Sequence, residues 1–329
     1  MKIAFLMDKL ESINPVNETT SCLMYECNQR GHTVYFLEPH DIYIRNQEIV
    51  ARMRNITVSP DLSMKKYWRS LINCLKKDEL VFETVSDLDA LFLRKNPPLA
   101  YQTMEFLSPI SDRVFIINST EGQILGNSKL YTLNFPNIIP ETHVSRDPAR
   151  LLKIIDNFGG AMVMKPLQRF GGEGVIKVSV KDQLNLKSLI NYYVRAYKSY
   201  EEREPIMVQE YVDTVQSKGD VRILMLNGEI LGAMRRKPCD GDFRTNIHAG
   251  ARAYKHKVTH KEKEICTIIK DRLLKDGLYF VGIDVIGDKL CEINCVSPGG
   301  IPRINRLDGV NLEAKVIDFI EQKTSEQKR

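Results

Sequence analysis

Apolar runs alternate with segments of helical period in the first third of the chain. Strands are expected where consecutive apolar residues occur, at 2–7, 32–38, 88–93 and 114–117. Helices are expected between them at 21–30, where Gly31 would end the helix, and at 64–77. The pattern of 41–51 is typical of a small hairpin. Strands that alternate with helices predict an open α/β sheet of the doubly wound kind. No GxGxxG follows the first strand, which argues against a nicotinamide-dinucleotide site.

The middle third contains a lysine within an apolar strand. The sequence Thr120-Glu-Gly-Gln123 has the form of a capping box and predicts a helix to Leu130 that carries Lys129 near its end. Residues 161–167 predict a buried strand that includes Lys165. Because an unpaired buried ammonium is costly, this side chain must reach a polar partner. Apolar residues at helical spacing over 186–197 predict a helix with one face in the core.

A glycine-rich turn follows that strand at 168–174. Glycines at 171, 172 and 174 let backbone N–H groups close on an anion. With Lys165 beside it, the turn favours a hairpin that covers a phosphate. A tight hairpin without a ligand is the alternative.

The last third predicts a second set of antiparallel strands. The expected elements are a strand at 206–212, a hairpin of 221–226 with 230–234 across Asn227-Gly228, a helix over 259–277 and a closing helix over 311–322 followed by a frayed tail. Residues 235–252 are basic, contain glycine and proline, and have no periodicity. We interpret them as a mobile loop, which is either a solvated surface loop or a lid over a triphosphate.

The run from Tyr279 to Asn294 predicts a hairpin that turns at Gly287-Asp288. Glu292 and Asn294 leave the same face of its second strand. A two-residue turn would send Asp284 to the other face, whereas a three-residue turn would set it opposite Glu292. In the second register two carboxylates and an amide oxygen converge, and these are ligands that suit Mg²⁺. A solvated polar face is the alternative.

Composition excludes several classes of protein. The net charge of +5 in 329 residues is too small and too dispersed to indicate nucleic-acid binding. Seven scattered cysteines form no disulfide framework. The apolar start is interrupted at Asp8 and no stretch is long enough to span a membrane, so we expect a cytoplasmic protein.

The order of these segments resembles the ATP-grasp ligases and, within them, the bacterial glutathione synthetases. The resemblance covers nearly the whole chain and is carried by RKNPP at 94–98, KL at 129–130, PET at 140–142, MKPL at 164–167 with FGGEG after it, QEYV at 209–212, GDVR at 219–222, RTNxxAGAR at 244–252 and GxDxIGDKLxEINxxSP at 282–298. Each segment alone is modest evidence, whereas the ordered set is specific.

The resemblance implies an ATP-grasp fold preceded by a doubly wound domain, α/β overall with an α+β C-terminal half. It implies a substrate domain over 1–120, a central lid domain over 121–204 and a domain with the metal and phosphate site over 205–329. ATP would lie between two antiparallel sheets. The residues that would bind it are Lys129, Lys165, Gly171, Gly172, Gly174, Gln209, Glu210, Tyr211, Val212 and Asp220.

The resemblance also implies roles around the reacting groups. Mg²⁺, with Mn²⁺ as an alternative, would be held by Asp284, Glu292 and Asn294. An acyl phosphate would be stabilised by Arg222, Asn246 and Arg252. The residues near the peptide substrate would be Asp8, Asn14, Arg94 and Ser297.

The reaction of this family joins γ-glutamylcysteine to glycine while ATP becomes ADP and phosphate. The implied partners are these small molecules and further copies of the chain, in a dimer or tetramer, with neither nucleic acid nor membrane. Gly299-Gly300 follow Ser297-Pro298 where glutathione enzymes usually have a threonine, a pattern closer to ribosomal-protein glutamate ligases. The alternative function is therefore another ATP-grasp carboxylate–amine ligase with a different pair of substrates.

Overall fold

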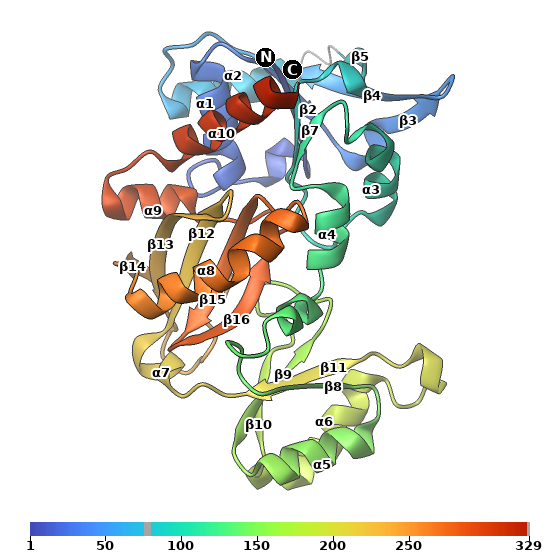
Figure 1. The fold of residues 1–329 in the computed structure, drawn as a ribbon, viewed down its shortest axis with the longest axis vertical. Coiled ribbons are helices and arrows are strands. Elements are labelled where there is room, and N and C mark those ends of the chain that lie inside the picture. The colour runs from blue at the N-terminus through green and yellow to red at the C-terminus, as the bar shows by residue number, and fades with distance from the viewer. Residues whose placement is uncertain (76–79, 328–329) are drawn as a thin grey trace.

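Three sheets follow one another along the long axis of the molecule. The computed structural model describes residues 1–75 and 80–327. A seven-stranded N-terminal sheet lies at the top of Figure 1, a five-stranded sheet in the middle and a four-stranded sheet at the bottom. The seven strands of the first sheet fall within the predicted range 1–120, whereas the four-stranded sheet takes β11 (Ile206–Glu210) from the predicted range 205–329. The domain limits themselves stay a prediction.

The N-terminal sheet has a parallel centre, as predicted. β1 pairs with β2 on one side and β6 on the other, both parallel, and β7 continues the sheet beyond β6. Its strands are β1 (Lys2–Leu6), β2 (Thr33–Leu37), β3 (Ile42–Arg45), β4 (Glu48–Asn55), β5 (Leu80–Thr84), β6 (Ala90–Leu93) and β7 (Phe115–Ile117). Its helices are α1 (Thr19–Gln29), α2 (Met64–Leu75) and α3 (Tyr101–Leu107). Residues 76–77, predicted to end the second helix, lie outside the described residues.

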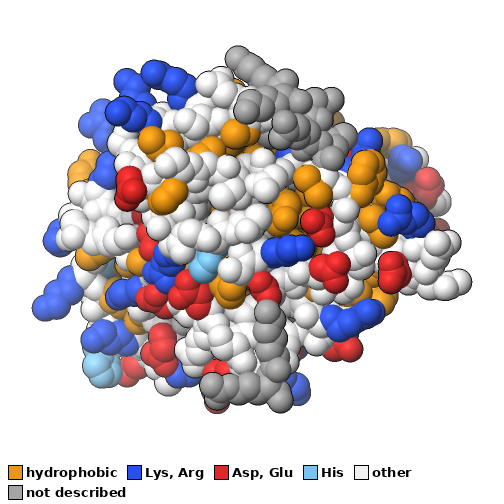
Figure 2. Space-filling model, turned by 90° about the horizontal axis from the view of Figure 1, so that it is seen from above, with side chains coloured by type: hydrophobic (Ala, Val, Ile, Leu, Met, Phe, Trp, Pro, Cys, Tyr) orange, Lys and Arg blue, Asp and Glu red, His pale blue; other side chains and the backbone are white. Residues whose placement is uncertain are grey.

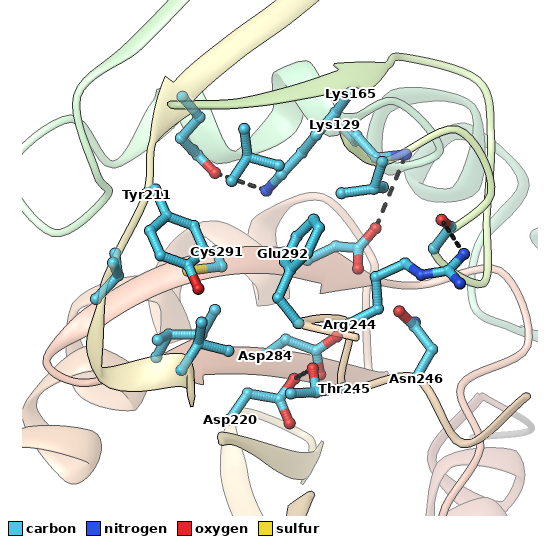
Figure 3. A pocket seen from close by; sticks show the side chains of 18 of the residues that line it. Lys129, Lys165, Tyr211, Asp220, Arg244, Thr245, Asn246, Asp284, Cys291 and Glu292 are labelled. Carbon is cyan, nitrogen blue, oxygen red and sulfur yellow. Dashed lines mark hydrogen bonds and ion pairs between the residues drawn. The ribbon is translucent and has the colours of Figure 1, made fainter. Parts of the chain in front are cut away.

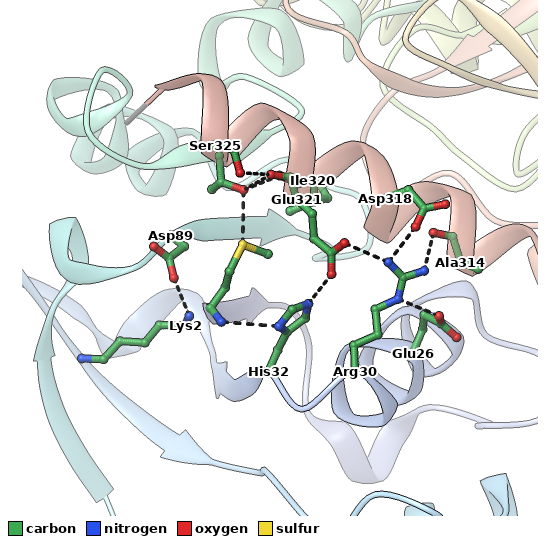
Figure 4. A network of polar contacts seen from close by, with 12 residues as sticks. Lys2, Glu26, Arg30, His32, Asp89, Ala314, Asp318, Ile320, Glu321 and Ser325 are labelled. Atoms are coloured by element: carbon green, nitrogen blue, oxygen red, sulfur yellow. Dashed lines mark hydrogen bonds and ion pairs between the residues drawn. The ribbon is translucent and has the colours of Figure 1, made fainter. Parts of the chain in front are cut away.

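The C-terminal helices return to this first sheet. α9 (Ile301–Asp308) was not predicted, and α10 (Leu312–Gln327) is longer than the predicted closing helix, so the tail is helical as far as Gln327. In Figure 4, Glu321 of α10 accepts a hydrogen bond from Arg30 and lies 2.8 Å from His32 Nε2. The buried side chains of α10, each worth about 2 kcal/mol, supply most of the attachment; they include Val316, Ile317 and Ile320.

The four-stranded sheet is antiparallel and is covered by two helices. The order is β10-β9-β11-β8, built from β8 (Thr142–Ser145), β9 (Ala161–Pro166), β10 (Ile176–Ser179) and β11 (Ile206–Glu210). α5 (Pro148–Phe158) and α6 (Gln183–Val194) pack against it. Leu186, Ile190 and Val194 are buried there, which confirms the predicted core stripe.

The five-stranded sheet carries more regular structure than predicted. Its order is β14-β13-β12-β15-β16. The elements are α7 (Thr214–Lys218), β12 (Asp220–Leu226), β13 (Glu229–Lys237), β14 (Arg252–Lys255), α8 (His260–Lys275), β15 (Phe280–Ile286) and β16 (Lys289–Asn294). The prediction of an irregular loop over 235–252 was wrong at both ends, because β13 extends to Lys237 and pairs with β14. Only residues 238–251 connect the two strands.

The predicted helix 120–130 is divided into two. The cap of α4 (Thr120–Gly126) is Ser119, one residue before the expected cap Thr120, since the side chain of Ser119 accepts a hydrogen bond from the Gly122 amide. Ser128 then accepts from the Leu130 amide and begins a separate 3₁₀ helix, Lys129–Asn134. Lys129 therefore lies at the start of a new element rather than at the end of a helix.

The surface at the N-terminal end of the molecule mixes both charges. Figure 2 shows acidic and basic side chains interspersed there, with hydrophobic side chains in separate patches. This agrees with the small net charge of +5. Within residues 1–75 and 80–327, no helix combines the length and hydrophobicity needed to cross a membrane.

Candidate active site

A β-bulge brings the predicted metal residues together. The turn at Gly287-Asp288 has two residues, because Ile286 pairs with Lys289 and Val285 with Leu290. The next pair is Asp284 with Glu292, so Cys291 has no partner on β15. The predicted convergence of Asp284 with Glu292 is thus correct, although the bulge produces it and not a longer turn.

Asp284 is buried between two arginines. Arg222 donates from Nε to Oδ1 at 2.5 Å and from Nη2 to Oδ2 at 3.0 Å. Nη2 of Arg236 lies 2.9 Å from Oδ1, and Asn294 Nδ2 donates to Oδ2 at 3.4 Å. Burial alone would raise the pKa of Asp284, but the two guanidinium charges outweigh it and hold the pKa far below its usual range.

Arg236 links Asp284 to a second buried carboxylate. It donates from Nε to Asp220 Oδ1 at 2.9 Å, and Thr245 donates to Asp220 Oδ2 at 2.6 Å. Burial raises the pKa of Asp220, an effect that the Arg236 charge opposes. Asp220 was predicted to bind the nucleotide. It lines the pocket, and both of its oxygens accept hydrogen bonds within the protein.

Two lysines face these carboxylates from the other side of the pocket. Figure 3 shows Lys129 and Lys165 above Glu292, with Asp284 below it. Lys129 Nζ lies 4.0 Å from Glu292 Oε1, and Lys165 Nζ donates to Gln209 Oε1 at 2.7 Å. Burial lowers the pKa of Lys129 and the Lys165 charge lowers it further, while Glu292 opposes both. Two cations opposite acidic groups leave room for an anion with a metal counter-ion.

All of the predicted nucleotide residues except Gly171 and Gly174 line one pocket, which meets a smaller pocket. Lys129, Lys165, Gly172 and Asp220 line the first together with the whole hinge, Gln209, Glu210, Tyr211 and Val212. The smaller pocket includes Asn127, Asn294 and Ser297. Lys129 and Glu292 line both pockets. In the part of the chain that the structure describes, the buried Asn127 Oδ1 has no hydrogen-bond partner.

The basic segment closes over the glycine-rich turn. Gly171, Gly172 and Gly174 have φ values of +63°, +82° and +69°, which favour glycine. Arg244 donates to the Gly172 carbonyl at 3.4 Å, and a Cβ on Gly172 would lie 2.5 Å from Asn246 Oδ1. These contacts favour the lid interpretation over that of a solvated loop.

The arginines of this segment divide differently from the prediction. Asn246 lines the pocket as expected. Arg236 and Arg244 also line it, although the sequence indicated no role for either residue. Arg252 lies on β14, is exposed, and is not among the residues that line either pocket. The role of Arg236 could have been predicted if the strand had been extended to Lys237, because Arg236 then pairs with Asp220 of β12.

Three of the four predicted substrate residues lie together. Asp8 accepts from the Asn96 amide at 2.8 Å, and Ser297 Oγ donates to the Arg94 carbonyl at 3.2 Å. Ser297 has φ +94°, a strained value that is concentrated at functional sites. The side chain of Asn14 accepts a hydrogen bond from the Val16 amide within its own loop, and no described hydrogen bond joins it to the other three.

The donor chemistry fits a hard divalent cation. Among the described residues no three His, Cys, Asp or Glu side chains form a metal cluster, and the predicted set is two carboxylates and an amide. Glu292 points into the pocket, and no hydrogen bond to its carboxylate occurs within residues 1–75 and 80–327. Asp284 already accepts hydrogen bonds or ion pairs on both oxygens, so it would have to release one donor to bind a metal.

Comparisons with known proteins identify the family. The family model of the prokaryotic glutathione synthetase N-terminal domain matches residues 1–122, and that of the ATP-grasp domain of the same family matches 128–309. A glutathione synthetase of Gloeobacter violaceus is 36% identical over 333 residues, covering 98% of both chains. One of Synechocystis sp. is 34% identical over 328 residues, covering 98% of this chain and 99% of the relative.

A solved structure confirms the fold. D-cycloserine synthetase DcsG superposes with a TM-score of 0.66 over 98% of this chain and 99% of that one. At 12% sequence identity this likeness concerns the ATP-grasp fold alone. The family models and the relatives show more than the fold, because they match the sequence itself over nearly the whole chain. The chain therefore belongs to the prokaryotic glutathione synthetase family and is an ATP-dependent ligase.

Proposed function

We propose that the chain joins γ-glutamylcysteine to glycine, forming glutathione while ATP becomes ADP and phosphate. The observation that carries the proposal is the position of Lys129 and Lys165 opposite Asp284 and Glu292 across one pocket. This arrangement suits a triphosphate with its metal. The neighbouring pocket, which shares Lys129 and Glu292, suits the peptide and the amine.

The hinge of β11 provides the adenine site in this proposal. Gln209 to Val212 line the pocket, and in the described residues the Val212 amide donates to no other group. A free N–H at this position can donate to a ring nitrogen of adenine. Lys129 and Lys165 then contact the phosphates, and the glycine-rich turn covers them.

The site residues activate a carboxylate rather than attack it. An amine cannot displace a carboxylate oxygen, so transfer of the γ-phosphoryl group first converts that oxygen into a leaving group. Asp284, Glu292 and Asn294 would hold Mg²⁺, or Mn²⁺ in its place, which when bound neutralises phosphate charge. Arg222 and Asn246 stabilise the charge that develops on the acyl phosphate.

The lid protects the activated substrate. An acyl phosphate exposed to water is hydrolysed, and residues 238–251 contact the glycine-rich turn through Arg244, which donates to the Gly172 carbonyl. In the smaller pocket, Asn127 Oδ1 is a free acceptor for an amine proton of glycine. We assign Asp8, Arg94 and Ser297 to the peptide substrate. Arg252 could contact the acyl phosphate only after a movement of β14.

Assembly and location follow from the family resemblance. We propose three domains with limits near 120 and 204, a homodimer or homotetramer, and a cytoplasmic enzyme. Light scattering of the purified protein measures the oligomeric state, and limited proteolysis locates the domain limits. A monomer would contradict the proposed dimer or tetramer.

A second candidate, a ligase for a different pair of substrates, has one observation in its favour. Gly300 has φ +144° and is required by the backbone, whereas Gly299 has an ordinary φ and a Cβ there would meet nothing within 4 Å. The space that threonine would fill is therefore open.

ADP release with a panel of acyl donors and amine acceptors distinguishes the two candidates. We expect turnover with γ-glutamylcysteine plus glycine, with a product of the mass of glutathione. Turnover only with another pair would support the second candidate. Absence of ADP release with every pair would contradict both.

A further inference from the structure

Two short helices at the edge of the smaller pocket present apolar side chains to solvent. Asn127, directly after α4, donates from Nδ2 to Tyr101 Oη at the start of α3, 3.1 Å away. Ser108, directly after α3, donates to Glu121 Oε1 near the start of α4 at 2.5 Å, so the two helices run antiparallel. Their outward side chains therefore lie next to one another. Four of these are large, apolar and 39–53% exposed, and we call them the α3–α4 face: Tyr101, Phe106, Ile124 and Leu125.

The apolar surface continues onto the neighbouring elements. β3 contacts α3, and the 3₁₀ helix Lys129–Asn134 contacts α4. Figure 1 shows β3, α3 and α4 following one another down one side of the molecule. These neighbours add three exposed side chains, Ile44, Leu130 and Leu133. With about 200 Å² for a fully exposed side chain of this size, the seven residues present about 600 Å² of apolar surface. A single exposed leucine is ordinary, whereas a continuous apolar surface of this size indicates an interaction site.

This region of the chain is poor in charge. Residues 96–140 contain five charged residues among 45, whereas 27% of the whole chain is charged. α3 and α4 carry one charge each, Glu105 and Glu121, and neither helix has a lysine or arginine. Glu121 already accepts hydrogen bonds from the hydroxyl groups of Ser108 and Thr120. Depletion of charge together with exposed aromatic residues is typical of the centre of a protein–protein interface.

A second group of exposed aromatic residues has a different setting. Tyr192, Tyr197 and Tyr200 are each more exposed than any residue of the α3–α4 face. However, six of the ten residues 195–204 are charged, and the guanidinium groups of Arg146 and Arg203 lie over the ring of Tyr200. A partner that covered these tyrosines would have to desolvate those charges, which is costly. On α3 and α4 such a cost arises at Glu105.

We propose that the α3–α4 face is the contact between two copies of this chain related by a two-fold axis. A two-fold contact uses the same surface twice, and a surface that is apolar and poor in charge can pack on its own copy without bringing like charges together. The area is sufficient, because a stable dimer buries about 800 Å² of each partner, of which about 65%, or about 500 Å², is apolar in homodimers. The inference rests on the homodimer or homotetramer of the proposed function and names the surface that forms it.

A charge placed on this face tests the assignment. The variants are Leu125→Glu and Phe106→Glu. The matched control is Ile268→Glu on α8, because Ile268 and Leu125 are both 53% exposed. These side chains lie at the surface of the single chain, so its fold should be retained, which circular dichroism and thermal unfolding check. Leu125→Gln adds no charge and replaces Leu125→Glu in the comparison if the glutamate impairs folding.

Light scattering and analytical ultracentrifugation of the purified full chain, over a range of concentrations, measure the mass and the dissociation constant. Each substitution occurs on both sides of a two-fold contact. We therefore expect the dissociation constant to rise about 100-fold or more in Leu125→Glu and Phe106→Glu, and about 10-fold in Leu125→Gln. The mass at a fixed concentration should halve in the glutamate variants, from dimer to monomer or from tetramer to dimer. Ile268→Glu should retain the mass of the parent protein.

The outcomes separate this inference from the proposals on which it rests. If the parent protein is oligomeric and its dissociation constant is unchanged in all three variants of the α3–α4 face, the inference is overturned and the proposed assembly stands. A monomeric parent protein would contradict both. Ligation of γ-glutamylcysteine to glycine by the parent protein is measured separately, because ADP release shows the activity whichever surface joins the copies.

Discussion

Asp284 and Glu292 face each other across β15 and β16 because Cys291 is inserted between Leu290 and Glu292 without a partner strand residue. Without that insertion the strict alternation of the hairpin would point the two carboxylates to opposite faces of the sheet. The bulge therefore determines whether this end of the sheet can hold a divalent cation. It also makes Cys291 part of the pocket lining.

Glu292→Gln should abolish turnover and leave the fold intact. The substitution keeps the size of the side chain and removes the charge that faces the phosphate site, which should reduce ADP release by about 100-fold or more. The melting temperature should not change, since this carboxylate has no hydrogen-bond partner in the described residues. Glu229→Gln, at an exposed ion pair with Lys270, is the control. Retained activity would show that the metal assignment is wrong.

Asp284→Asn should destabilise the protein as well as inactivate it. The variant leaves Arg222 and Arg236 buried without their shared counter-charge, at a cost of about 3–5 kcal/mol in the free energy of unfolding at neutral pH. Urea unfolding measures this difference. A difference below that of an exposed ion pair, about 1 kcal/mol, would mean that the two arginines relax to other partners.

The effect of Asp284 on stability should depend on pH in one direction. Its pKa is lower in the folded state than the value of about 3.9 in an unfolded chain. Its contribution is therefore complete above that value and is lost as the pH falls toward the folded-state pKa. The stability difference between the parent protein and Asp284→Asn should shrink below pH about 4. A difference that shrinks near neutral pH would point to another group.

Gly172→Ala and Gly171→Ala should differ although both place alanine at a positive φ. A Cβ at Gly172 would meet Asn246 Oδ1 at 2.5 Å, whereas one at Gly171 meets nothing within 4 Å. Displacement of Asn246 and the lid should lower kcat about 10- to 100-fold in Gly172→Ala and raise ATP hydrolysis without ligation. Product formation and ADP release, measured together, report both effects. Equal losses in the two variants would attribute them to backbone strain.

ATP affinity should fall at alkaline pH because of Lys129. Burial lowers the pKa of this lysine in the free protein, and bound phosphates should raise it again. Affinity therefore decreases as the pH rises through the free-state pKa, and binding above it takes up a proton. Calorimetric titration of ATP in buffers of different ionisation enthalpy measures both quantities. Lys129→Arg, which stays charged, should show a flatter pH dependence; an unchanged dependence would exclude Lys129 as its source.

Local sequence patterns predicted most of the strands and a few residues of the nucleotide pocket, while the family resemblance supplied the hinge residues, Gln209 to Val212. Residue spacing placed Glu292 and Asn294 on one face, because side chains alternate along a strand whatever surrounds it. The glycine-rich turn and Lys165 were likewise recognisable, since φ preferences and the cost of a buried ammonium depend on the residue itself. The ordered motifs then identified the family.

Only the tertiary structure decided which distant charges meet. The bulge at Cys291 and the pairing of Arg236 with Asp220 and Asp284 both depend on strand register. Residue spacing within one segment carries no information on these contacts, because they join elements whose relative position is determined by the packing of the whole core. Sequence therefore specified the faces of the elements, and packing specified which faces and charges came together.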